Sequence, residues 1–199
     1  MCKIIVMANQ KGGVAKTSST RNLAYSLAEL GKKVLAVDFD PQTNLTISFG
    51  VAPAALQETA ASLMMKLVMD EVLPEKGSYI LNIGKVDLLP SKKTLTVAEV
   101  NLLIERKDDC LAKLLAPLRA DYDYILVDTG PSLGSLTINA FTAADEIIIP
   151  VDPELFALVG LKELTETISK IKQNLNPKVE IIGILFTKCS KRTTLYRQT

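Results

Sequence analysis

The stretch NQKGGVAKTSS, Asn9–Ser19, lies between an apolar run and a helical pattern. The run Lys3–Ala8 is typical of a buried strand, and the pattern that follows the stretch repeats apolar residues along one helix face and ends at Gly31. A loop that joins a strand to a helix presents unpaired backbone N–H groups and the positive end of the helix dipole. We therefore expect Asn9–Ser19 to bind phosphate.

Four residues of this loop have expected roles in phosphate and metal binding. Gly12 and Gly13 allow close approach of the backbone, Lys16 would reach the β- and γ-phosphates, and Thr17 would hold Mg²⁺. The alternative is an ordinary glycine turn capped by threonine and serine. The position between strand and helix favours the phosphate site. The predicted nucleotide-binding residues are Lys11, Gly12, Gly13, Val14, Ala15, Lys16, Thr17 and Ser18.

Apolar runs recur along the chain and alternate with helical patterns. This alternation predicts an α/β fold, with a mainly parallel sheet that has helices on both faces. Val51–Tyr79 interrupts the alternation and is expected to be a helical excursion within one domain, residues 1–199. The predicted strands are Lys3–Ala8, Val34–Asp38, Val86–Leu89, Tyr124–Asp128, Glu146–Pro150 and Glu180–Thr187.

A late helical pattern has two interpretations, a helix on the sheet or a coiled-coil seam. It is too short for a stable coiled coil, so we favour the helix on the sheet. Its apolar positions are Leu161, Leu164, Ile168, Ile171 and Leu175.

Composition excludes several classes of site. The chain has no histidine, which excludes His-based triads and His-ligated metals. Its three cysteines are widely spaced, which argues against a disulfide framework and favours the cytoplasm. The net charge of +1 means that nucleic-acid binding would need a local basic patch. No run of 18 apolar residues predicts a membrane span.

Three aspartates follow predicted strands. Asp128 ends an apolar strand at the edge where open α/β sheets bind ligands, and would hold Mg²⁺ through water. Asp38 and Asp40 lie two residues apart at the end of another strand. In each case, the alternative is an aspartate that caps a turn.

Lys11 needs its own explanation, because Lys16 already serves the γ-phosphate from within the loop. Lys11 would instead reach a nucleotide bound to a second copy of the chain, as an arginine finger does. The loop KGGVAKTS resembles the deviant Walker A loop, K-G-G-x-x-K-[ST], of the ParA/MinD/nitrogenase iron-protein class of P-loop ATPases. In that class the first lysine acts across a dimer.

The resemblance to ParA/Soj partition ATPases covers nearly the whole chain except Val51–Tyr79. Two departures stand out: Ala15 replaces a glycine, and Gly130 replaces the first proline of D-x-P-P-S. A Cβ at Ala15 would crowd the phosphate if its φ is positive. The similar blocks are Lys32–Thr46, Val86–Ser91, Asp121–Leu164 and Gly183–Gln198.

The resemblance implies a slow ATPase that uses ATP and Mg²⁺, dimerises around ATP, and partitions plasmid or chromosomal DNA with a ParB-like activator. It implies catalytic roles for Lys11, Lys16 and Asp40, of which Asp40 would orient the attacking water and is a possible metal ligand through water. Thr17 and Asp128 would be the metal ligands, and Asp38 would support the metal or the loop. The protein would be cytoplasmic, and nucleoid-associated when ATP-bound.

The run Lys188–Thr199 is basic and has no acidic residue. Such a run is often only a solvated surface, but the resemblance favours contact with DNA of any sequence. ParA proteins continue beyond this point, so we expect the chain to lack their usual C-terminal part. The predicted DNA-binding residues are Lys188, Lys191, Arg192 and Arg197.

Three other functions compete with partitioning. A MinD-like regulator on a membrane surface would need a C-terminal amphipathic helix, which the sequence does not show. A metabolic enzyme with this loop is the second alternative. An iron-protein reductase would need paired cysteines for an iron–sulfur cluster, and a dethiobiotin-synthetase-like ligase would usually lack Lys11. A nucleotide-binding scaffold with little turnover stays open because of Ala15.

Overall fold

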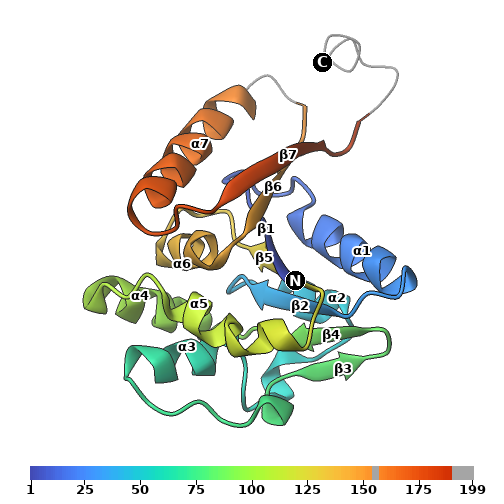
Figure 1. Ribbon diagram of the computed structural model, residues 1–199, viewed down its shortest axis with the longest axis vertical. Coiled ribbons are helices and arrows are strands. Elements are labelled where there is room, and N and C mark those ends of the chain that lie inside the picture. The colour runs from blue at the N-terminus through green and yellow to red at the C-terminus, as the bar shows by residue number, and fades with distance from the viewer. Residues whose placement is uncertain (154–156, 190–199) are drawn as a thin grey trace.

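The computed structural model describes residues 1–153 and 157–189 (Figure 1). These residues form a seven-stranded sheet in the order β3-β4-β2-β5-β1-β6-β7. Every neighbouring pair is parallel except β3 and β4, which pair antiparallel at one edge. The strands are β1 (Lys3–Met7), β2 (Val34–Phe39), β3 (Leu81–Ile83), β4 (Val86–Leu89), β5 (Tyr124–Thr129), β6 (Glu146–Val151) and β7 (Glu180–Phe186).

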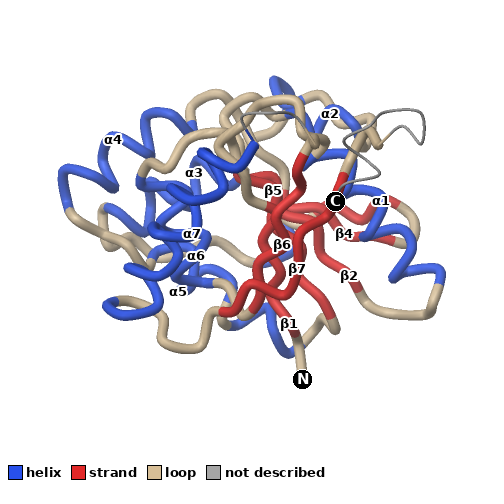
Figure 2. Tube along the Cα trace, turned by 90° about the horizontal axis from the view of Figure 1, so that it is seen from above, coloured by secondary structure: helices blue, strands red, loops and turns tan. Residues whose placement is uncertain are grey.

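Helices cover both faces of this sheet, as predicted. Figure 2 shows the strands in the middle, with α3 to α7 on one side and α1 on the other. The α-helices are α1 (Lys16–Glu29), α2 (Asn44–Ser48), α3 (Ala60–Val68), α4 (Leu95–Glu105), α5 (Cys110–Leu115), α6 (Ser135–Ala143) and α7 (Ala157–Asn174). Three short 3-10 helices are η1 (Pro53–Ala55), η2 (Lys76–Ser78) and η3 (Pro117–Ala120).

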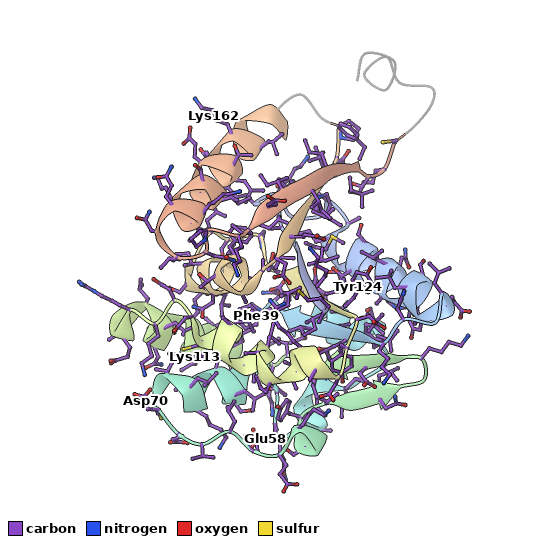
Figure 3. The ribbon with its side chains drawn as sticks, viewed as in Figure 1. Phe39, Glu58, Asp70, Lys113, Tyr124 and Lys162 are labelled. Atoms are coloured by element: carbon purple, nitrogen blue, oxygen red, sulfur yellow. The ribbon has the colours of Figure 1, made fainter. Side chains whose placement is uncertain are left out.

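The central strands are apolar because both of their faces are buried. In β2 every residue is buried, and successive side chains alternate between two cores. Phe39 belongs to the larger core, beneath α3 to α7, whereas Ala36 belongs to the smaller core under α1. Figure 3 shows Phe39 in the interior and charged residues such as Lys162 at the periphery.

The late helical pattern is a helix on the sheet, which confirms the preferred interpretation. Within α7, Leu164, Ile168 and Ile171 are buried in the larger core. Leu161 packs against the same core, whereas Leu175 lies just beyond the helix and is exposed. One apolar face of α7 is therefore covered by this chain itself.

The predicted strands are all present, with small differences at their ends. Val86–Leu89 agrees, and the other strands end one residue earlier or later than predicted. The sequence analysis missed β3, which is short and only partly buried. Val51–Tyr79 is a helical excursion as predicted, and its α3 packs on α4 and β2.

The sheet order brings three loops together. Because β1, β5 and β2 are neighbours and run parallel, the loops after them leave from the same edge. In this register Asp128 lies beside Met7 on one side and Asp38 on the other. The predicted phosphate loop and the predicted aspartates thus meet at one place.

Two further expectations concern the membrane and the cysteines. No helix among residues 1–153 and 157–189 is long and apolar enough to cross a membrane. All three cysteines are free thiols, and the two buried ones, Cys2 and Cys110, have pKa values raised by burial.

Candidate functional site

A cavity of about 520 Å³ opens at the edge where β1, β2 and β5 end. It brings together residues from the loop after β1, the start of α1, the segment after β2, the end of β5 with the segment that follows it, and the segment after β7. Its lining residues are Gly12, Gly13, Ala15, Lys16, Thr17, Ser18, Asp40, Gln42, Asn44, Thr129, Pro131 and Lys188.

The loop after β1 has two left-handed residues. Gly13 has φ +74° and Ala15 has φ +64°, and α1 begins at the next residue, Lys16. No side chain caps the first turn of α1, so its N–H groups and the positive end of its dipole face the cavity. Ala15 therefore has the left-handed backbone conformation that is unfavourable for a residue with a Cβ and that glycine adopts more readily.

Lys16 is the buried cation of the loop. Its Nζ donates to the carbonyl oxygens of Asn9 at 2.8 Å and Lys11 at 3.3 Å. Burial lowers the pKa of Lys16, and the nearby charges of Asp128 and Asp40 act in the opposite direction. The ammonium is thus held at the floor of the loop, where a bound phosphate would accept from it.

Thr17 and Asp128 form the other polar centre. The Thr17 Oγ1 donates to Asp128 Oδ2 at 2.6 Å, which joins the start of α1 to the end of β5. Desolvation by burial, with the charges of Asp38 and Asp40, raises the pKa of Asp128 to about 7, and the Thr17 hydrogen bond and the Lys16 charge act in the opposite direction. Such a carboxyl is stabilised as a carboxylate by a nearby cation.

The two aspartates at the end of β2, Asp38 within the strand and Asp40 just after it, have different surroundings. Asp38 Oδ2 accepts from Thr46 N at 2.7 Å and from Thr46 Oγ1 at 2.6 Å, so it anchors the start of α2. Burial raises the pKa of Asp38 to about 6. Asp40 lines the cavity, and its Oδ1 accepts from Gln42 N at 2.9 Å. Of the two roles left open for Asp38, the contacts favour support of the loop.

The side-chain oxygens beside the loop can be compared with the ligands that Mg²⁺ prefers. Among the described residues there is no group of three or more acidic or cysteine side chains that would hold a metal unaided. Mg²⁺ does not need such a cage, because it keeps waters and takes phosphate oxygens. The Thr17 hydroxyl and the Asp128 carboxylate supply oxygen ligands of the right kind beside the loop.

Two predicted loop residues do not line the cavity. Val14 points into the protein and is 1% exposed, and its carbonyl accepts from Thr187 Oγ1 at 3.1 Å. Lys11 is exposed at the rim, where its N–H donates to Asn9 Oδ1 at 2.9 Å. Lys11 is thus exposed and is not among the described residues that line the cavity.

Sequence reasoning missed five residues of the cavity. Gln42 and Asn44 follow Asp40, and Thr129 and Pro131 follow Asp128, so their closeness to known candidates was the available signal. Lys188, which the sequence places in the predicted DNA-binding patch, also lines the cavity, and its contact with DNA stays a prediction. The other members of that patch, Lys191, Arg192 and Arg197, lie outside the described residues.

Known proteins share this sequence pattern. The model of the AAA domain family AAA_31 matches residues 2–181. The chromosome partitioning protein ParA of Myxococcus xanthus is 38% identical over 98% of this chain and 68% of its own length. The sporulation initiation inhibitor protein Soj of Bacillus subtilis is 39% identical over 98% of this chain and 76% of its own length. The chain belongs to the ParA/Soj family.

One relative in this ParA/Soj family is considerably longer. An uncharacterised protein of Mycobacterium tuberculosis is 42% identical over 98% of this chain, and the match covers 61% of its length. The chain thus spans about three fifths of this relative.

Solved structures confirm that the family fold is a P-loop fold. A cobyrinic acid a,c-diamide synthase from Mycobacterium smegmatis, solved with ADP and magnesium, matches with a TM-score of 0.91 and 36% identity, over all of this chain and 79% of the other. A plasmid partition protein from Borrelia burgdorferi matches with a TM-score of 0.81 and 30% identity, over 98% of this chain and 82% of the other.

Proposed function

We propose that this chain is an ATP-driven molecular switch that binds ATP with Mg²⁺, hydrolyses it slowly and dimerises around it. The observation that carries the proposal is the convergence of Lys16, Thr17, Asp40 and Asp128 at one edge of the sheet. Phosphoryl transfer needs little covalent chemistry from the protein. The protein has to position the phosphates and the attacking water and to stabilise the charge of the transition state, and these four side chains contribute to both.

Each residue has a distinct task in this proposal. Lys16 and the N–H groups at the start of α1 bind the phosphates. Thr17 and Asp128 would hold Mg²⁺, which supplies charge stabilisation at the phosphates when it is bound. Asp40, held by its bond to Gln42 N, orients the attacking water, and a water-mediated contact to the metal is part of the proposal.

Lys11 acts on the nucleotide of a second copy. Its exposed place at the rim supports this role, because the charge arrives at the γ-phosphate only when two copies meet. The active form is accordingly a homodimer that assembles with ATP. Without a partner copy, the site would bind ATP but lack the charge that Lys11 of the second copy supplies in the transition state.

The biological role that we infer is partitioning of plasmid or chromosomal DNA, in the cytoplasm and on the nucleoid. Two relatives or neighbours whose names refer to partitioning support this role. The dimer would bind DNA of any sequence through the basic run that begins at Lys188, and a ParB-like protein would stimulate hydrolysis. Arg192→Glu should weaken binding equally on every DNA sequence and reduce its salt dependence.

The proposal is tested by comparing Asp40→Ala with the unchanged chain. Asp40→Ala should bind ATP with similar affinity and lose turnover, because a carboxylate that positions water matters only when the phosphoryl group moves. Turnover is measured with and without DNA, and Glu75→Ala, an exposed site on the loop before η2, is the control. Normal turnover by Asp40→Ala would remove Asp40 from the mechanism.

One observation favours a second function, a nucleotide-binding scaffold with little turnover. The positive φ of Ala15 places a Cβ in the loop that has to surround the phosphates. If ATP binds but no turnover is detected with DNA present, the scaffold is the better description.

A further inference from the structure

The cavity has a second lysine that comes from the far end of the chain. Lys188 follows β7, whereas the other described lining residues come from the first 131 residues. Its Nζ lies 3.9 Å from the position that a Cβ on Gly13 would occupy. The ammonium therefore stands over the middle of the phosphate-binding loop, close to the backbone of Gly13.

Two contacts fix the end of β7 to this loop. Thr187 N donates to Val151 O at 2.8 Å, which continues the pairing of β7 with β6. The Thr187 hydroxyl lies 3.1 Å from Val14 O, so the same residue reaches the loop itself. Lys188 is the next residue, and its position relative to Gly13 is therefore set by the backbone rather than by a long free segment.

The backbone of Lys188 is unusual. Its φ of +54° is rare for a residue with a side chain, and such conformations cluster at functional sites. Ala15, on the same cavity, and Thr43, between the lining residues Gln42 and Asn44, also have positive φ. Three of the described non-glycine residues with positive φ thus lie where the loops after β1, β2 and β7 meet, whereas Asp70 and Arg106 lie elsewhere.

Charge completes the argument. Lys188 Nζ lies 3.5 Å from Asp152 Oδ2, and the Asp152 side chain is only 14% exposed, whereas that of Lys188 is 56% exposed. The lysine is thus directed toward the loop by a largely buried carboxylate and keeps enough exposure to bind a ligand. Among the residues that the structure describes, the cationic side chains that line the cavity are Lys16 and Lys188.

We propose that Lys188 binds a phosphate of the nucleotide in its own chain, as a second cation beside Lys16. This rests on the proposed function, because it names a further residue of the same nucleotide site. A polyanionic ligand between two ammonium groups would be held by charge-assisted hydrogen bonds from both. The alternative for Lys188 is the DNA contact, which the test below separates from this one.

The test measures binding of ATP, ADP and adenosine, in the presence of Mg²⁺, to Lys188→Met and to the unchanged chain. Loss of one charge-assisted contact should weaken ATP and ADP by about tenfold and leave adenosine unchanged. Lys188→Arg should keep most of the affinity, because it keeps the charge. Lys178→Met, which removes a charge from an exposed site in the turn before β7, is the matched control and should bind normally.

An indirect effect through Asp152 is separated by a double variant. If Lys188 only neutralises Asp152, then Asp152→Asn combined with Lys188→Met should recover the affinity of the unchanged chain, and the proposal is wrong. If Lys188 touches phosphate, the double variant should bind ATP and ADP more weakly than Asp152→Asn alone.

The remaining outcomes are also decisive. If the unchanged chain binds ATP, Lys16→Ala does not, and Lys188→Met binds as the unchanged chain does, then the inference fails and the proposed function stands. Weaker DNA binding with normal nucleotide affinity in Lys188→Met would assign the lysine to DNA. If the unchanged chain binds no nucleotide, both the proposed function and the inference are wrong.

Discussion

The carboxylate of Asp40 packs against the backbone of Gly130. A Cβ built on Gly130 would lie 3.2 Å from Asp40 Oδ1 and 3.4 Å from its Cγ. That spacing is tighter than an ordinary van der Waals contact, so a side chain at position 130 would displace the carboxylate. The glycine that departs from the D-x-P-P-S pattern thus lies beside the residue proposed to position water.

Gly130→Ala should therefore reduce ATP turnover and leave ATP binding intact. The shift of Asp40 is a few tenths of an ångström, and misplacing a catalytic group lowers the rate strongly, here on the order of tenfold. Turnover and nucleotide affinity are measured on the same preparation. Gly77→Ala is the control, because no atom lies within 4 Å of a Cβ there. Unchanged turnover in Gly130→Ala would show that Asp40 tolerates the movement or has no part in the rate.

The backbone at Ala15 leads to a second prediction. The left-handed conformation of a residue with a Cβ costs about 1–2 kcal/mol of folding free energy. Replacing that residue by glycine removes this cost, but part of the gain is lost because glycine makes the unfolded chain more flexible. Ala15→Gly should therefore raise the free energy of unfolding by about 0.5–1 kcal/mol. It should also strengthen ATP binding, because Ala15 lines the cavity. Urea denaturation and nucleotide titration measure the two effects.

Arg106→Gly separates these two effects. Arg106 has φ +52° and is exposed at the end of α4, outside the residues that line the cavity. It should gain similar stability and bind ATP as the unchanged chain does. Equal gains in affinity at both positions would mean that stability alone, and not relief at the phosphate, strengthens binding.

The contact between Thr17 and Asp128 leads to a third prediction, on metal removal. If both residues hold Mg²⁺ at the phosphates, excess chelator should weaken ATP binding at least tenfold. Thr17→Val keeps the shape of the side chain but loses its oxygen, and should make ATP affinity nearly independent of Mg²⁺. Thr165→Val, at a partly exposed position of α7 away from the cavity, is the control. Calorimetry that gives equal ATP affinity with and without chelator would contradict this assignment.

The sequence predicted the parts of the site that depend on local pattern. Val- and Ile-rich runs mark the strands because both sheet faces are buried, and aspartates at the strand ends mark the ligand edge. Because β1 and β5 are parallel neighbours, the loop after β1 and the aspartate at the end of β5 lie at the same edge, where Thr17 meets Asp128. The order of the strands does not follow, because it depends on packing between segments far apart in the chain.

Other parts of the site were not predictable for the same physical reason. The positive φ of Ala15 depends on how the whole loop closes against α1, which the residues of the loop do not determine by themselves. Lys188 looks like the first residue of a basic run, since nothing local reveals that β7 ends beside Gly13. The edge strand β3 was missed because only three residues form it and none is fully buried.

The last prediction concerns Lys11 and Lys16, which carry the same charge and lie five residues apart in one loop. Lys16→Ala should lose ATP binding outright, because its ammonium is buried at the floor of the loop, where the phosphates bind. Lys11→Ala should bind ATP as a monomer but neither assemble the nucleotide-bound dimer nor hydrolyse, because Lys11 is exposed at the rim and acts on the partner copy. Sedimentation with a slowly hydrolysed ATP analogue reports assembly, and fluorescence of a labelled nucleotide reports binding. Normal dimerisation and turnover by Lys11→Ala would exclude the role across the dimer. Loss of monomer binding in both variants would place both lysines on one nucleotide.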